Sequence, residues 1–192
     1  MIEQIEQSIL DQIQPVVLVG GKSSRFGRDK LVEQVNGHAM VSAPINALRA
    51  VFGARVAIVG QCDEQIAQLA DATIDDPYPG LGPVGGVCAA LEGARSDIFV
   101  LAGDLVSIDE HTIRTIIAES IEHPQAICLL AHDGRRHPTV GLYRAGCVEH
   151  FQQALADEKL KLGMVLDQES VHHVHVNSIA LRNINHPDEL TE

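Results

Sequence analysis

Short, mostly apolar runs alternate with amphipathic segments along most of this chain. An apolar run without polar alternation is typical of a strand that is buried on both faces of a sheet, whereas apolar residues spaced by three and four indicate a helix. The runs expected to form strands are 16–19, 55–59, 72–75, 98–102, 126–130, 139–143 and 171–176. The alternation predicts an α/β fold in which helices cover both faces of a parallel sheet.

Helices are expected between these runs. The apolar spacing predicts them over 41–52, around 66–69, and over 84–91, 113–121 and 151–162. Pro44 is tolerable in a first turn, and Asp109 is a plausible N-cap. Ile2, Ile5, Ile9 and Ile13 predict an amphipathic helical extension over residues 1–14, which Pro15 would end, and residues 15–192 are expected to form a single domain.

The bulk charge excludes some partners. The 192 residues carry a formal net charge of −12, which argues against binding to nucleic acid or to an anionic membrane surface. An anionic ligand would therefore need a local basic cluster, and Lys22, Arg25, Arg28 and Lys30 provide one.

Cysteine usage and hydropathy point to a cytoplasmic protein. Cys62, Cys88, Cys128 and Cys147 form no C-x-x-C pair and lie in apolar surroundings, so we expect buried, reduced thiols. No apolar run approaches the roughly 18 residues of a membrane span. The first residues are acidic rather than basic, unlike a signal peptide.

The most informative motif follows the first apolar run and reads LVGGKSSRFGRDK over residues 18–30. Glycines let a backbone approach a phosphate or a base and leave N–H groups free to donate. Arg25 and Lys30 can neutralise a triphosphate. A Walker motif does not fit, because that motif needs a glycine at the position of Val16.

A second glycine motif, GLGPVG at 80–85, matches the G-x-G-x-x-G pattern of dinucleotide-binding proteins, and Asp104 follows at about the expected interval. An NAD(P)-binding oxidoreductase is therefore an alternative of a different class. The sequence around the motif argues against this alternative, because Pro77 and Pro79 separate the motif from any strand and Pro83 removes a backbone donor. We instead expect a mobile glycine loop that opens a helix near the substrate.

Asp104 stands directly after the apolar run 98–102. Because ligands of parallel α/β sheets bind at the carboxyl ends of the strands, Asp104 should face the loop after Val19. Mg²⁺ prefers one or two carboxylates together with substrate phosphates, so Asp104 is a candidate metal ligand.

Two histidine-containing segments leave alternatives open. The segment HDGRRHP at 132–138 is either a basic hairpin for a second anionic substrate or an exposed turn. His172, His173 and His175 lie on an expected strand, where 173 and 175 share a face; a solvated or packed face is favoured there over a metal site. No serine or cysteine has the context of a catalytic nucleophile, which favours direct reaction between two bound substrates.

Together these segments resemble the molybdenum cofactor guanylyltransferases, the MobA family within the nucleotidyltransferase superfamily. The resemblance rests on 18–30, on DDPYPGLGPVGG, on AGD at 102–104, on HDGRRHPTVGLY and on RNINHPDEL, in the family's order over about residues 15–190. It implies a Rossmann-like, doubly wound fold and the transfer of GMP from GTP to the terminal phosphate of molybdopterin. It also implies Mg²⁺ as cofactor, and chaperones of molybdoenzymes or other cofactor-assembly proteins are expected partners.

The resemblance also implies roles for individual residues. Catalytic roles fall to Arg25, Lys30 and Asp104, with Asp104 as the ligand of Mg²⁺. The residues expected to contact the nucleotide are Leu18, Val19, Gly20, Gly21, Lys30, Asp76 and Asp104. The residues expected to face molybdopterin are Gly82, Pro83, Gly85, His137 and Pro138.

The expected N-terminal helix precedes the family's usual start, and the chain departs from the family pattern at two further places. Many relatives have Cys-Asp-x-Pro where this chain has Gly103-Asp104-Leu105-Val106, and Val59 stands where a relative can offer Asn to the nucleotide. A CTP-dependent cytidylyltransferase, or an enzyme with another phosphorylated acceptor, therefore remains an alternative. A GTP-binding regulator without activity is a third, which the retained Arg25, Lys30 and Asp104 disfavour.

Overall fold

The computed structural model describes residues 7–20, 29–166 and 171–184. Its main sheet has seven strands in the order β5-β4-β1-β6-β8-β7-β9. These are β1 (Ile13–Leu18), β4 (Ala57–Val59), β5 (Ala72–Ile74), β6 (Asp97–Ala102), β7 (Cys128–His132), β8 (Arg136–Tyr143) and β9 (Val171–His175). Only β8 runs antiparallel to its neighbours in this sheet, so the predicted mostly parallel α/β fold is confirmed.

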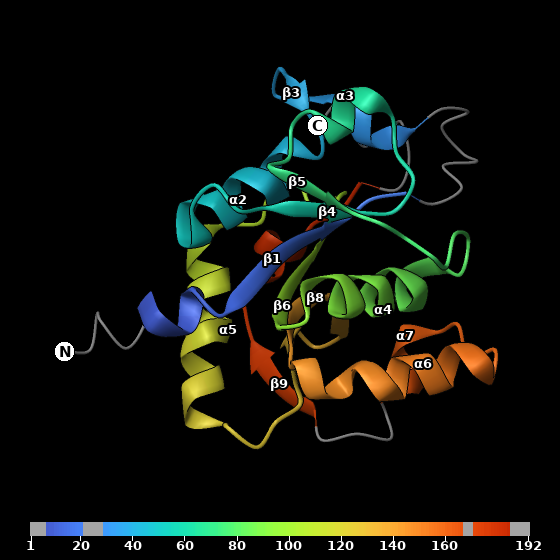
Figure 1. Cartoon of the computed structure of the whole chain (residues 1–192). Helices are drawn as coiled ribbons and strands as arrows, with labels where there is room; N and C mark the ends of the chain where they lie inside the picture. The colour runs from blue at the N-terminus through green and yellow to red at the C-terminus, as the bar shows by residue number, and fades with distance from the viewer. Residues whose placement is uncertain (1–6, 21–28, 167–170, 185–192) are drawn as a thin grey trace.

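Helices cover both faces of the sheet (Figure 1). One face carries α2 (Ser42–Phe52), α3 (Glu64–Ala67) and α5 (Glu110–Glu122), and the other carries α4 (Gly82–Ala94), α6 (Val148–Ala156) and α7 (Leu162–Leu166). Smaller elements are the hairpin of β2 (Gln34–Val35) and β3 (His38–Ala39) and the 3-10 turns η1 (Lys30–Val32), η2 (Ala145–Cys147) and η3 (Ser178–Leu181). Within the described ranges no helix is long and apolar enough to cross a bilayer.

The apolar runs of the sequence follow from this layering. Along β6, Phe99 and Leu101 pack into the core under α2 and α5, whereas Ile98 and Val100 pack into the core under α4 and α6. Successive side chains of a strand point to opposite faces, so a strand covered on both sides needs apolar residues at every position.

Local capping also follows the sequence. The Asp109 carboxylate accepts a hydrogen bond from the Thr112 amide at 2.8 Å, which confirms it as the N-cap of α5. Pro44 lies in the first turn of α2, where it removes no intrahelical hydrogen bond.

The predicted N-terminal helix was wrong in its second half. Residues 7–10 are helical, but Ile13 and Gln14 already belong to β1, where they pair with Asp97 and Ile98. The spacing of Ile9 and Ile13 suits a helix, yet Ile13 is buried as the first residue of a strand that continues through Pro15. Residues 1–6 lie outside the described ranges.

Two further segments differ from the prediction. The single helix expected over 151–162 is divided into α6 and α7 by a turn in which Glu158 has a positive φ of 57°. The polar segment 132–138 is mostly strand, so the connection between β7 and β8 shrinks to residues 133–135. The turn-forming residues Asp133 and Gly134 lie in this connection, which is shorter than the sequence suggested.

The strand register brings distant segments to one edge of the sheet. Leu18 pairs with both Val59 and Ala102, and Val59 pairs with Ile74. The chain therefore leaves β1, β4, β5 and β6 at the same edge, which we call the carboxyl edge. Because β8 is antiparallel, it begins at that edge with Arg136.

Candidate nucleotide site at the carboxyl edge

The turns after β1 and β4 press against each other without room for side chains. A Cβ atom on Gly60 would lie 1.9 Å from the Val19 carbonyl oxygen, and one on Gly20 would lie 2.8 Å from the Gln61 carbonyl oxygen. Both glycines have positive φ, 93° at Gly20 and 113° at Gly60. Glycine is thus required at both positions for close approach and for conformation. The sequence had suggested close approach to a ligand at Gly20 and had given no role to Gly60.

The turn after β6 joins the same group. The Gly103 amide donates to the Leu18 carbonyl at 3.0 Å, and a Cβ on Gly103 would lie 3.0 Å from Leu31 Cδ1. Gly103 therefore sets Asp104 beside the end of β1, as the sequence predicted.

Lys30 and Asp104, which are 74 positions apart in the sequence, form an ion pair. Lys30 Nζ lies 2.6 Å from Asp104 Oδ2, and the two side chains are 20% and 18% exposed. The Asp29 carboxylate fixes the start of η1 by accepting the Leu31 amide at 3.1 Å, which aims Lys30 at Asp104. Oδ1 of Asp104 accepts no hydrogen bond from any described residue, so this carboxylate oxygen could coordinate a metal ion.

The segment after β9 adds further contacts to Lys30 and Asp104. The Ile184 carbonyl accepts a second hydrogen bond from Lys30 Nζ at 3.0 Å, and the Ile184 amide donates to the Asp104 carbonyl at 3.3 Å. Leu105 also bridges to Asn183. The role of Ile184 was missed by the sequence reasoning, because a backbone carbonyl leaves no signal in residue type.

Asp76 follows β5 at the same edge. Its Oδ1 accepts the Tyr78 amide at 2.9 Å, which folds the loop toward α4. The Tyr78 hydroxyl donates to the Glu92 carboxylate at 3.0 Å, and burial together with this carboxylate raises the pKa of Tyr78. Asp76 therefore stabilises the loop by accepting a hydrogen bond at one carboxylate oxygen, and the sequence did not predict this contact.

The glycine loop 80–85 opens α4 as predicted. Gly82 has a positive φ of 68°, and Pro83 lies in the first turn of the helix. A Cβ on Gly85 would lie 3.0 Å from Tyr78 Cβ, so the loop packs directly on the helix. Since β5 ends at Ile74, no strand leads into Gly80, and the arrangement that a dinucleotide fingerprint requires is missing from this described segment.

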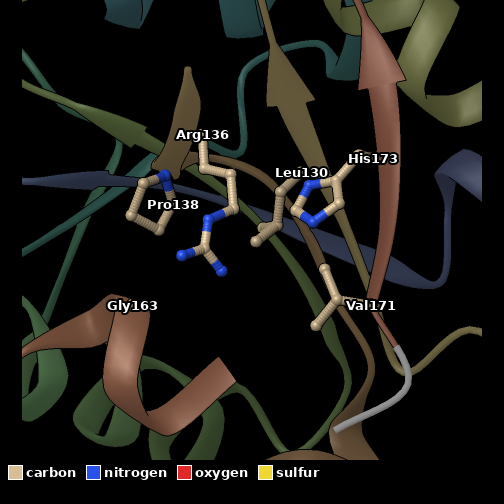
Figure 2. Close-up of a pocket in the computed structure, with 6 residues that line it drawn as sticks. All are labelled: Leu130, Arg136, Pro138, Gly163, Val171 and His173. Atoms are coloured by element: carbon tan, nitrogen blue, oxygen red, sulfur yellow. The ribbon is translucent and has the colours of Figure 1, made fainter. Parts of the chain in front are cut away.

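The predicted acceptor residues of β8 are divided between two environments. His137 Nε2 lies 2.8 Å from Asp133 Oδ1, and this hydrogen bond lowers the pKa of Asp133. Pro138 instead lines a pocket on the α7 side of the sheet (Figure 2), and its carbonyl accepts the buried Tyr143 hydroxyl. The residues that line the pocket are Leu130, Arg136, Pro138, Gly163, Val171 and His173.

Some predicted residues lie outside the described ranges or differ from expectation. Gly21 and Arg25 fall in 21–28, which the structure does not describe. Cys88, Cys128 and Cys147 are buried thiols as predicted, but Cys62 is only half-buried. Burial, Asp29 and Asp63 raise the pKa of the Cys62 thiol.

Comparison with known proteins identifies the family. A family model described as the MobA-like NTP transferase domain matches residues 15–174. The chain belongs to this family. It is therefore a nucleotidyltransferase.

Named relatives agree with this assignment. The chain is 27% identical over 186 residues to a probable molybdenum cofactor guanylyltransferase of Pelotomaculum thermopropionicum, covering 92% of this chain and 89% of the relative. It is 30% identical over 204 residues to a molybdenum cofactor guanylyltransferase of Rhizobium johnstonii, with the same two coverages.

A solved structure shares the fold. The molybdopterin-guanine dinucleotide biosynthesis protein A of Archaeoglobus fulgidus superposes with a TM-score of 0.76 at 21% identity, covering 92% of this chain and 94% of that one. The doubly wound arrangement is thus shared with that protein.

Proposed function

We propose that this enzyme transfers GMP from GTP to the terminal phosphate of molybdopterin and releases pyrophosphate. The observation that carries the proposal is the Lys30–Asp104 pair at the carboxyl edge, where three glycine turns meet. The family and the names of the relatives support the substrate class.

The glycine turn after β1 would receive the nucleotide. Leu18, Val19 and Gly20 would contact it through backbone groups at the end of β1, beside the turn after β4. Gly21 would extend this backbone contact, and Asp76 would contact the nucleotide from the neighbouring turn. Val59, which offers no hydrogen bond, leaves recognition of the base to backbone groups.

The charged pair would separate when the substrate binds. Lys30 now neutralises Asp104 at 2.6 Å, which stabilises a carboxylate that is 18% exposed. Bound Mg²⁺ would supply positive charge that neutralises the triphosphate, and Asp104 with its open Oδ1 is the residue that would hold it. Lys30, released from Asp104, would then bind the β- and γ-phosphates together with Arg25.

The transfer itself needs no covalent enzyme intermediate. An oxygen of the molybdopterin phosphate attacks the α-phosphorus of GTP, the bond from that phosphorus to the bridging oxygen of the β-phosphate breaks, and pyrophosphate leaves with the electron pair. Lys30 stabilises the charge that develops on the leaving group. The enzyme thus contributes position and electrostatics.

The acceptor would approach from the α4 side of the carboxyl edge. The N-terminus of α4, with Gly82, Pro83 and Gly85, lies at that edge, and a helix N-terminus favours an anionic group. Arg136 adds a positive charge in the pocket beside Pro138, and His137 lies next in the strand. These groups suit an acceptor that carries a phosphate.

Thermal-shift titration with GTP, CTP, ATP and NADH, each with and without Mg²⁺, tests the donor, because a ligand that binds the folded state raises its apparent stability. We expect GTP with Mg²⁺ to give the largest shift. A larger shift with CTP would assign the enzyme to cytidylyl transfer. A shift with NADH alone would overturn the proposal.

A further inference from the structure

Three side chains that commonly bind metals meet where the parallel strands begin, at the opposite end of the strands from Asp104. We call this end of the sheet the opposite edge. Glu119 and His123 lie one turn apart at the end of α5, and His172 is the second residue of β9. Figure 1 shows α5 and β9 side by side. β9 runs parallel to β7 and thus to β1 and β6, so its first residues lie where the parallel strands begin.

The potential ligand atoms of this cluster already converge. His172 Nε2 lies 3.2 Å and His123 Nδ1 lies 3.5 Å from the same carboxylate oxygen, Oε2 of Glu119. One ligand atom from each residue can be chosen so that all three lie within 4.8 Å of one another. Ligand atoms on a tetrahedral zinc ion lie about 3.3–3.5 Å apart, because each bond is about 2.0–2.1 Å long. Two of the three separations are therefore close to this spacing, and His123 Nδ1 also lies 3.2 Å from the Glu119 carbonyl oxygen, a contact that metal binding would replace.

The two imidazole rings stack, with centroids 3.6 Å apart and an angle of 27° between planes. Because an imidazole nitrogen binds a metal ion in the plane of its ring, one of the two rings would turn out of the stack when an ion binds. A neutral imidazole is the form that binds a metal.

The local field also favours a cation. The cluster lies at the C-terminus of a 13-residue helix, where the unpaired carbonyl groups carry a partial negative charge. The nearby Arg144 is already paired, since it donates to Asp97 at 3.0 Å and to the Ser120 carbonyl at 3.0 Å. The three side chains are 29–41% exposed, so an ion can reach them from solvent.

We propose that Glu119, His123 and His172 form a binding site for a divalent transition metal of the zinc class. Two imidazoles and one carboxylate are a known zinc ligand set that leaves a fourth position for water. The ion would join the last turn of α5 to β9, one of the two edge strands of the sheet. This site differs from the His173–His175 face considered from the sequence, because His172 points to the other side of the strand.

The test is calorimetric titration of Zn²⁺ into the metal-depleted full chain. The variants are His123→Phe and His172→Phe, each of which keeps a flat ring for stacking but removes the ring nitrogens. His111→Phe, on an exposed position of the same helix, is the matched control. Circular dichroism checks that each variant is folded, and glutamine at the same position replaces any phenylalanine variant that is not.

We expect one zinc site in the wild type that also raises the melting temperature. Since loss of an outer-shell partner alone weakens binding about 10- to 100-fold, loss of either histidine ligand should weaken it by at least about 10-fold. Binding to His111→Phe should be unchanged. Absence of zinc binding by the wild type, or wild-type affinity in both histidine variants, would overturn the proposal. Asp104→Asn should bind zinc like the wild type, so this test is independent of the proposed transfer reaction.

Discussion

The two ends of the parallel strands concentrate charged side chains in different ways. At the carboxyl edge, Lys30 and Asp104 project from turns, and their positions depend on glycines that allow backbones to touch. At the opposite edge, Glu119, His123 and His172 project from a regular helix and a regular strand. The comparison teaches that the first cluster depends on backbone geometry, whereas the second depends only on side chains that regular elements present.

The largest effect is expected from Asp104→Asn. The substitution keeps the side-chain shape but removes the charge that pairs with Lys30 and would bind Mg²⁺. Loss of one such electrostatic group lowers turnover about 100- to 1,000-fold. Steady-state measurement of dinucleotide formation checks this, with the exposed Glu149→Gln as control. Turnover of Asp104→Asn within a factor of two of the wild type would remove Asp104 from the site.

Gly60→Ala should be the most damaging substitution for folding at the carboxyl edge. The new Cβ would lie 1.9 Å from a backbone oxygen at a residue with φ of 113°. Overpacking and an unfavourable φ each cost about 1–3 kcal/mol, so we expect the free energy of unfolding to fall by about 2 kcal/mol or more. Urea denaturation measures it.

The matched control for that experiment is Gly146→Ala, where the new Cβ would meet no atom within 4 Å. Its free energy of unfolding should stay within about 0.5 kcal/mol of the wild type. Equal stability of the two variants would contradict the claim that the turns after β1 and β4 require direct backbone contact.

A smaller effect is expected from Asp109→Ala on α5, the helix that carries the opposite cluster. The variant loses the 2.8 Å hydrogen bond to the Thr112 amide, so the free energy of unfolding should fall by about 1 kcal/mol. Urea denaturation beside Asp109→Asn, which can still cap, gives the measurement. Equal loss in both variants would show that the hydrogen bond is not the cause.

The smallest effect on transfer is expected from His172→Phe. The residue lies at the edge opposite to Asp104, so dinucleotide formation under metal-depleted conditions with added Mg²⁺ should remain within about twofold of the wild type. A loss comparable to that of Asp104→Asn would mean that the two edges do not act independently.

The sequence predicted the elements of the carboxyl edge better than their contacts. Apolar runs and glycines predicted where the strands lie and end, and the family resemblance indicated Lys30 and Asp104. Both predictions depend only on residue type and on the order of motifs along the chain. The ion pair, the Ile184 carbonyl and the Asp76–Tyr78 turn could not be predicted, since they depend on register and on backbone atoms. Ile13 misled the helix prediction because one residue can satisfy a helical spacing and still start a strand.

At the opposite edge, the sequence contains the residues of the proposed metal site, but they lie in two separate segments. Glu119 and His123 have the i,i+4 spacing that places two side chains on one helix face, and the histidines of β9 were noted. Which of those histidines faces the helix depends on the strand's side in the folded sheet, and this required the structure.

The most direct test of the central claim follows the phosphorus atoms of GTP. The purified enzyme, molybdopterin and Mg²⁺ are incubated with GTP labelled either at the α- or at the γ-phosphate, and the products are separated. Nucleotidyl transfer predicts α-label in a molybdopterin–guanine dinucleotide and γ-label in pyrophosphate. Label from the γ-position in molybdopterin, or γ-label released as orthophosphate with no dinucleotide, would contradict the proposed reaction.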